Sequence, residues 1–146
     1  PDELAQGRID HALVASYPHT KDGGPVSPAS TSDGNSTRAD AIPEGARIQL
    51  DPGLNLDRLG LSRETKIIAR ALQEYGMYVG DTGGGPNIYA VHPYSFSSDP
   101  WTGVWGSGAS ASLRSIPAES FRVLALGPQQ PLERFRPQND GCGSVS

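Results

Sequence analysis

The sequence predicts a mainly β fold, a β-sandwich with one α-helix packed at its side. Glycine (18) and proline (13) are abundant among the 146 residues, which favours many short strands joined by turns. Only one long segment, residues 62–75, has helical periodicity. The other apolar segments alternate with period two, as half-buried strands do.

The helix and the strand after it give the clearest local signal. Ser62 is the expected N-cap and Glu64 lies in the first turn, where a negative charge is favourable. One apolar stripe predicts the buried face of the helix: Ile67, Ile68, Ala71, Leu72 and Tyr75. We expect Gly76 to take the left-handed conformation that ends the helix. A buried strand, residues 77–79, then follows at once.

Four further segments are predicted strands: residues 9–17, 46–50, 87–91 and 121–126. Residues 87–91 are expected to return as the hairpin partner of residues 77–79. Two irregular regions, residues 18–41 and 92–112, connect these strands. Long loops on a rigid sheet are where binding sites are most common.

We expect a β-sandwich domain over residues 1–126 and an extended tail rich in Pro, Gln and Gly over residues 127–146. Because Pro1 is not an initiator Met, the chain is expected to be mature or truncated. The tail holds the only cysteine, Cys142, which cannot form an internal disulfide. It is either an inert free thiol or a bridge to another chain.

The charge pattern argues against two classes of partner. The net charge is −4 and the basic residues are scattered, so no stripe could follow a phosphate backbone and no nucleic-acid partner is expected. No apolar run approaches the roughly 18 residues that a membrane span requires. The bias toward arginine over lysine, ten against two, is typical of a GC-rich bacterial genome.

Asp10 and His11 place a carboxylate beside an imidazole. Adjacent side chains on a strand point to opposite faces, so the two are not expected to touch. His11 would share a face with Ile9 and Leu13. Two interpretations are open for it: a hydrogen-bonded histidine of the core or of a ligand cavity, or a general acid/base or metal ligand in a cleft.

Other motifs are absent or incomplete. The sequence has no HExxH, no Cys/His cluster and no EF-hand loop, so no metal and no other cofactor is expected. Asp81-Thr82-Gly83 resembles the aspartic-protease triplet in letters only, because no second copy exists to complete the dyad. The Gly83–Gly85 triplet precedes a predicted strand, so no helix N-terminus follows it to bind a phosphate.

Four aromatic residues, Tyr94, Phe96, Trp101 and Trp105, lie in a stretch rich in Gly and Ser. Aromatic rings displayed on loops are typical platforms for sugar rings. The alternative is that these rings cover the edge of the sandwich.

Four sequence blocks occur in order: GRIDHAL at 7–13, IPEGARIQLDP at 42–52, ARALQEYGMYVGD at 69–81 and FRVL at 121–124. Together, over residues 2–126, they resemble the C-terminal half of a family of secreted actinobacterial and fungal proteins of mostly unknown function. That family combines GxIxHAL, IPxGxRxxLDP and ALQxYGxYVxD patterns. The resemblance implies export, a concanavalin-like or jelly-roll sandwich and a carbohydrate-related role. It also implies an N-terminal half that this chain lacks, so a second polypeptide segment would complete the sandwich.

The resulting hypothesis is a secreted carbohydrate-active protein, a glycoside hydrolase or lyase that acts on an extracellular polysaccharide. His11 and Asp10 are the candidate catalytic residues. The candidate substrate contacts are Arg47, Gln49, Trp101 and Trp105. The alternative is a non-catalytic glycan-binding or structural assembly module, which is favoured by the lack of an evident carboxylate pair, because glycosidases generally use two carboxyl groups.

Overall fold

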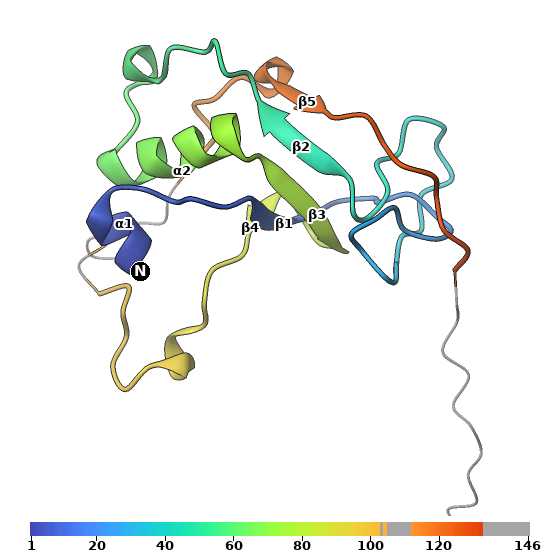
Figure 1. The fold of residues 1–146 in the computed structure, drawn as a ribbon, viewed down its shortest axis with the longest axis horizontal. Helices are drawn as coiled ribbons and strands as arrows, with labels where there is room; N and C mark the ends of the chain where they lie inside the picture. Colours follow the sequence, from blue (N-terminus) through green and yellow to red (C-terminus); the bar gives the residue numbers. More distant parts are fainter. Residues whose placement is uncertain (103, 105–111, 133–146) are drawn as a thin grey trace, which may run out of the picture.

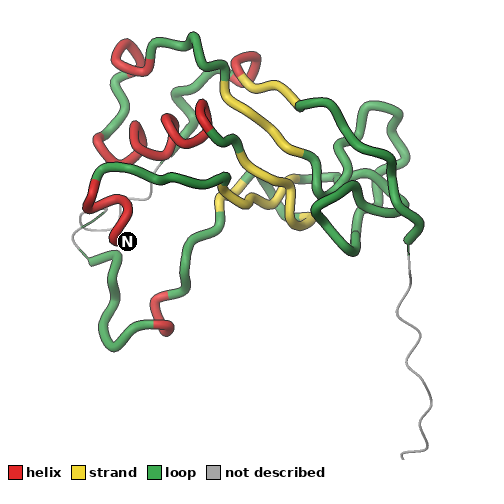
Figure 2. The backbone as a smooth tube through the Cα atoms, viewed as in Figure 1, coloured by secondary structure: helices red, strands yellow, loops and turns green. Residues whose placement is uncertain are grey.

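One mixed five-stranded sheet with a long helix against it forms the body of the molecule (Figures 1 and 2). The computed structural model describes residues 1–102, 104 and 112–132. The strand order is β4-β1-β3-β2-β5. Only β1 and β3 are parallel, and every other neighbouring pair is antiparallel. The strands are β1 (Leu13–Tyr17), β2 (Arg47–Leu50), β3 (Met77–Thr82), β4 (Asn87–Ile88) and β5 (Phe121–Val123).

The core forms where α2 (Arg63–Glu74) meets the inner positions of the three central strands. Because side chains alternate along a strand, the buried apolar residues of these strands are two positions apart: Leu13 and Ala15, Ile48 and Leu50, Met77 and Val79. The apolar stripe of α2 is buried with them, as its sequence predicts. The other face of the sheet is open at Val14, which is 43% exposed.

At both ends of α2 the structure confirms the residues that were predicted to begin and end the helix. The Ser62 hydroxyl accepts a hydrogen bond from the backbone N–H of Thr65 at 3.2 Å, which satisfies one of the free amides at the helix start. Gly76 has φ +73°, the left-handed conformation that favours glycine. A Cβ at Gly76 would also lie 2.5 Å from the Ile48 carbonyl oxygen, so the turn into β3 has no space for a side chain.

Several predicted strand boundaries and one predicted strand pairing are wrong. β3 continues to Thr82 rather than ending at residue 79, and β4 ends at Ile88 rather than at residue 91. β1 begins at Leu13, so Asp10 and His11 lie in the segment before it. β5 ends at Val123 rather than at residue 126. β4 pairs with β1 and forms no hairpin with β3, because β1 and β2 already occupy both edges of β3. The chain after β3 therefore crosses the end of β1, where the Gly83 N–H donates to the Tyr17 carbonyl oxygen at 3.2 Å.

The architecture is thus a β-sheet with one long helix packed on it, the coarser form of the predicted fold. The described residues form a single sheet, so the second sheet of a sandwich is not among them. The remaining helical elements are short and lie in the connections: α1 (Asp2–Gln6), η1 (Leu56–Leu59), η2 (Pro93–Ser95) and η3 (Ala118–Ser120).

The long region 18–41 is held against the body mainly through its own backbone. The N–H of Lys21 donates to the Ile42 carbonyl oxygen and that of Val26 to the Glu44 carbonyl oxygen, both at 2.9 Å. The C-terminal segment lies along the same region, because the Gln130 N–H donates to the Pro25 carbonyl oxygen at 2.7 Å. Cys142 and the rest of the predicted tail after residue 132 lie outside the described residues.

Candidate functional site

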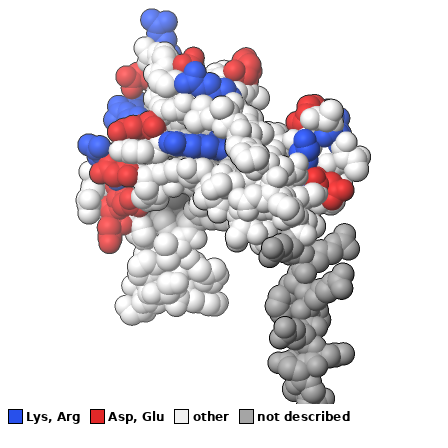
Figure 3. Space-filling view, turned by 45° about the vertical axis from the view of Figure 1, so that its right-hand side comes forward, with Lys and Arg blue, Asp and Glu red and all other residues white. Residues whose placement is uncertain are grey.

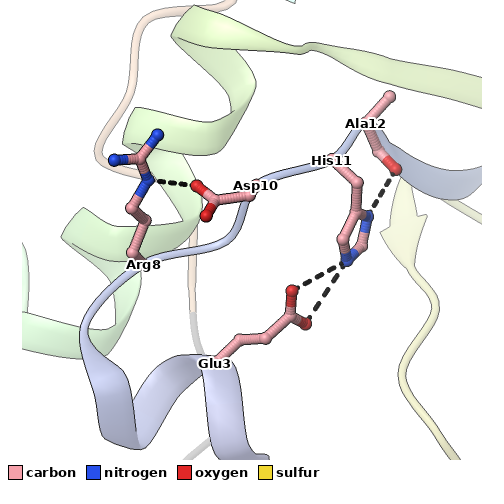
Figure 4. A network of polar contacts seen from close by, with 5 residues as sticks. All are labelled: Glu3, Arg8, Asp10, His11 and Ala12. Atoms are coloured by element: carbon pink, nitrogen blue, oxygen red, sulfur yellow. Dashed lines mark hydrogen bonds and ion pairs between the residues drawn. The ribbon is translucent and has the colours of Figure 1, made fainter.

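His11 lies on the surface, in a polar network with the N-terminal helix (Figure 4). Its side chain is 58% exposed, so the expectation that it shares a buried face with Ile9 is wrong. Its Nδ1 lies 2.9 Å from the Ala12 carbonyl oxygen, and its Nε2 lies 3.1 Å from Glu3 Oε1. Both neighbours are acceptors, so both ring nitrogens donate only when the ring is protonated. The carbonyl of Ala12, and then Glu3, raise the pKa of His11.

Asp10 belongs to a different pair. Its carboxylate accepts a charge-assisted hydrogen bond from Arg8, and Figure 4 shows this pair separate from the one between His11 and Glu3. As the sequence predicts, no hydrogen bond joins Asp10 to His11. The two candidate catalytic residues therefore lie near each other, each paired with its own neighbour of opposite charge.

Arg47 and Gln49, the candidate substrate contacts of β2, both reach the C-terminal end of α2. Arg47 Nε donates to the Tyr75 carbonyl oxygen at 2.6 Å, and Gln49 Nε2 donates to the Gln73 carbonyl oxygen at 2.9 Å. The last carbonyls of a helix have no partner within the helix and attract cations. These two side chains thus fasten the helix end to the sheet, a use that the sequence pattern did not indicate.

In the aromatic stretch, one ring packs against the body of the protein and two rings are exposed to solvent. Trp101 packs against the core, and its Nε1 donates to the Val91 carbonyl oxygen at 3.0 Å. Tyr94 is 93% exposed and Phe96 is 42% exposed, so neither ring covers the sheet. Trp105, the second candidate tryptophan, lies outside the described residues.

A pair of carboxyl groups that the sequence analysis missed lies near the carboxyl ends of β1 and β3. Glu44 is only 3% exposed, and its Oε1 accepts from the hydroxyls of Thr20 and Thr82, each at 3.2 Å. The Asp33 carboxyl is hydrogen-bonded to Glu44, and its Oδ1 accepts from the Thr82 N–H at 3.2 Å. Burial, and then the bond to Asp33, raise the pKa of Glu44; that same bond and Thr82 lower the pKa of Asp33.

Because the two pKa values shift in opposite directions, the pair holds one proton, carried by Glu44, in the pH range between the pKa values of Asp33 and Glu44. Glu44 lies in a turn and Asp33 in a long polar loop, so no residue spacing in the sequence brings them together. The one available signal was Glu44 itself, a carboxylate between the apolar residues Ile42 and Ala46.

A second hydroxyl–carboxylate pair lies near this cluster. The Tyr89 hydroxyl donates to Asp81 Oδ2 at 2.8 Å, and this bond raises the pKa of Tyr89. Asp81 thus fixes the start of the aromatic stretch. In the described part of the chain, no group of three or more His, Cys, Asp or Glu side chains is arranged to hold a metal ion.

Over the same described ranges, no helix has the length and apolar character needed to cross a membrane. Comparisons of the chain with family models, with curated proteins and with solved structures find no match.

Proposed function

We propose that this chain is a secreted carbohydrate-binding protein that holds an extracellular polysaccharide on the aromatic segment 89–101. The observation that carries the proposal is the near-complete exposure of the Tyr94 ring, 93%. Large aromatic side chains normally bury most of their surface, so an exposed ring on a segment fixed at its base is a candidate contact surface.

The segment has the chemistry that a sugar ring requires. Between Tyr89 and Trp101 the only Asp, Glu, Lys or Arg is Asp99, and the lobe that projects below the body in Figure 3 is uncoloured, free of visible charged groups. Exposed rings supply apolar faces that stack on sugars, and neighbouring serines supply hydroxyls. The Trp101–Val91 and Tyr89–Asp81 hydrogen bonds hold both ends of the segment, which lowers the entropy lost on binding.

The polar sites favour binding over hydrolysis. Asp10 and His11 are each engaged in an ion pair. The two carboxyl groups of the close pair, Glu44 and Asp33, are hydrogen-bonded to each other, and Glu44 is buried. Glycosidases instead separate their two carboxyl groups by about 5–9.5 Å around the scissile bond. This arrangement supports the non-catalytic module over the glycoside hydrolase or lyase.

Affinity electrophoresis in gels that contain soluble polysaccharides tests the proposal. We expect retardation of the native chain in at least one gel. Tyr94→Ala should weaken binding about two- to tenfold, in line with the roughly 0.5–1.5 kcal/mol typical of an aromatic contact. Val123→Ala, at an exposed apolar residue outside the segment, is the control. Retardation that survives both Tyr94→Ala and Phe96→Ala would overturn the assignment of this surface.

A second candidate function, the glycoside hydrolase or lyase, is favoured by His11. An exposed imidazole with a raised pKa carries a proton that it could donate as a general acid. The release of reducing ends or of unsaturated products from the same polysaccharides, lost in His11→Ala and retained in Arg8→Ala, would establish this function. Binding without product supports the module.

We also propose that a second polypeptide segment extends the sheet into a jelly-roll-type sandwich. Both outer strands are short, since β4 has two residues and β5 has three. Sheet edges with free N–H and C=O groups are templates for an added strand. Hydrogen exchange tests this: the amides of β5 should exchange more slowly in the complete product of the gene than in this chain, and equal rates would contradict the proposal.

A further inference from the structure

A groove separate from the aromatic segment opens beside β2 and contains Arg47. Its volume is about 250 Å³, and it is lined by the backbone stretches 26–27, 45–47 and 124–127 together with Tyr78. Drug-sized ligands occupy pockets of about 300–1,000 Å³, so this groove fits one small ring rather than an oligomer. Arg47 is the only charged residue in the lining.

The guanidinium of Arg47 is held in place while its terminal nitrogens stay available. Nε donates to the Tyr75 carbonyl oxygen at 2.6 Å, and the guanidinium carbon lies 5.8 Å from the centre of the Tyr78 ring. Within the described part of the chain, Nη1 and Nη2 have no hydrogen-bond partner. A fixed guanidinium with two free NH2 groups is suited to bind a carboxylate through two parallel bonds.

The groove also supplies the two other contacts that a sugar acid requires. Tyr78 is half-buried, and the Arg47 guanidinium lies over its ring. The part of the ring that the guanidinium leaves open is an apolar surface on which a sugar face can stack. Residues 125–127 form one wall, and in the described part of the chain their backbone N–H groups donate to no protein acceptor. Neutral donors of this kind suit the hydroxyl or carboxylate oxygens of a ligand.

We infer that this groove binds a single carboxylate-bearing sugar, a uronate residue, with Arg47 on the carboxylate and Tyr78 beneath the ring. The site depends on the proposed glycan-binding function only for the class of ligand, because it lies apart from residues 89–101. An acidic polysaccharide would then contact the protein at two places, the neutral aromatic segment and this cationic groove.

The test is an NMR titration of the full chain that monitors Arg47 Nε–H and the amides of residues 125–127. D-glucuronate should shift these signals in a saturable way, while D-glucose should not. Acetate and inorganic phosphate distinguish a sugar acid from a simple anion, and we expect each to bind at least tenfold more weakly. Equal responses to glucuronate and glucose, or to glucuronate and acetate, would overturn the inference.

Variants assign the binding to the two residues. Arg47→Lys keeps the charge but loses the paired N–H groups, so glucuronate affinity should fall at least tenfold; unchanged affinity would refute the role of Arg47. Tyr78→Leu should weaken glucuronate but not acetate, and an equal effect on both would refute stacking. Arg122→Gln, at an exposed arginine on β5, is the control, and circular dichroism confirms that each variant is folded.

The same variants separate this inference from the proposed function. Tyr94→Ala should weaken polysaccharide retardation and leave the glucuronate titration unchanged. If the protein binds glucuronate at Arg47 but no polysaccharide retards it, the inference about the groove is supported and the proposed function is refuted. If neutral polysaccharides retard the protein but glucuronate causes no NMR response, the proposed function is supported and the inference about the groove is refuted.

Discussion

Replacing Glu44 with glutamine should flatten the dependence of the free energy of unfolding on pH. Glu44 is almost fully buried between the hydroxyls of Thr20 and Thr82 and the carboxyl of Asp33. Glutamine has the same shape, accepts from the hydroxyls through its oxygen and donates to Asp33 through its nitrogen. The variant therefore keeps the hydrogen bonds and removes only the need for a proton.

The direction in which the free energy of unfolding changes with pH follows from the two pKa shifts. The pKa of Glu44 is raised above its ordinary value of 4.5, so the folded state keeps a proton that the unfolded state has released. Its stabilising contribution is complete below about pH 4.5 and is lost as pH rises through the folded-state pKa. The pKa of Asp33 is lowered from 3.8, so its contribution is present above about pH 3.8 and is lost as pH falls through its own folded-state pKa.

The slope of the free energy of unfolding against pH is set by the one proton that Glu44 holds in the folded state. Above pH 4.5 the native protein should lose stability, relative to the variant, at up to about 1.4 kcal/mol per pH unit until Glu44 ionises in the folded state. Near pH 4.5 the two should differ by less than about 1 kcal/mol, because the hydrogen bonds are matched. Glu44→Ala should instead lose about 1–3 kcal/mol at that pH, since two hydroxyls lose an acceptor.

Urea unfolding followed by circular dichroism from pH 4 to pH 8 measures these differences. Glu119→Gln, at an exposed glutamate of η3, is the control and should run parallel to the native curve. If the native and Glu44→Gln curves are parallel between pH 4.5 and pH 8, then the carboxyl pair shares no proton and the reasoning is wrong.

Four further outcomes are expected. Leu72→Ala should lose about 2–5 kcal/mol in urea unfolding, because Leu72 is fully buried between helix and sheet; a loss below 1 kcal/mol would contradict this packing. Ser62→Ala should lose about 0.5–2 kcal/mol through the Thr65 amide, whereas Ser62→Asp should restore it. Gly76→Ala should lose more than Gly60→Ala: both glycines are left-handed, which costs about 1–2 kcal/mol at either position, but a Cβ at Gly76 would also lie 2.5 Å from the Ile48 carbonyl oxygen, whereas a Cβ at Gly60 has open space. Glu3→Gln should lower the NMR titration midpoint of His11, because one of its two acceptors loses its charge. This exposed pair stabilises the fold by less than about 1 kcal/mol, only below the folded-state pKa of His11. An unchanged midpoint would mean that the pair does not form in solution.

The elements that could be predicted were those with a local cause. Ser62 and Gly76 end a helix through their own backbone bonds and φ, and the stripe from Ile67 to Leu72 fixes which face of that helix is buried. The alternation of residues 46–50 likewise sets the inner face of β2. Each of these signals acts within about four residues, so neighbouring letters are sufficient to read it.

Strand pairing could not be read in the same way. Residues 87–91 look like the return strand of a hairpin, yet β4 pairs with β1 because both edges of β3 are occupied. The pairing of β4 with β1 joins residues that are more than 70 positions apart in the sequence. His11 was misplaced for a related reason: alternation continues through residues 9–12, but the ladder with β3 starts only at Leu13.

The sequence by itself determined a β-rich body with one capped helix, a low-charge aromatic stretch and the absence of a basic stripe, because these depend on composition and short-range periodicity. Tertiary structure alone decided which side chains meet. It placed Asp33 against Glu44, placed Arg47 at the end of α2 and in the lining of a groove, and separated half-buried Trp101 from exposed Tyr94. Burial and hydrogen bonding change the chemistry of such groups, and both arise only when distant segments of the chain come together.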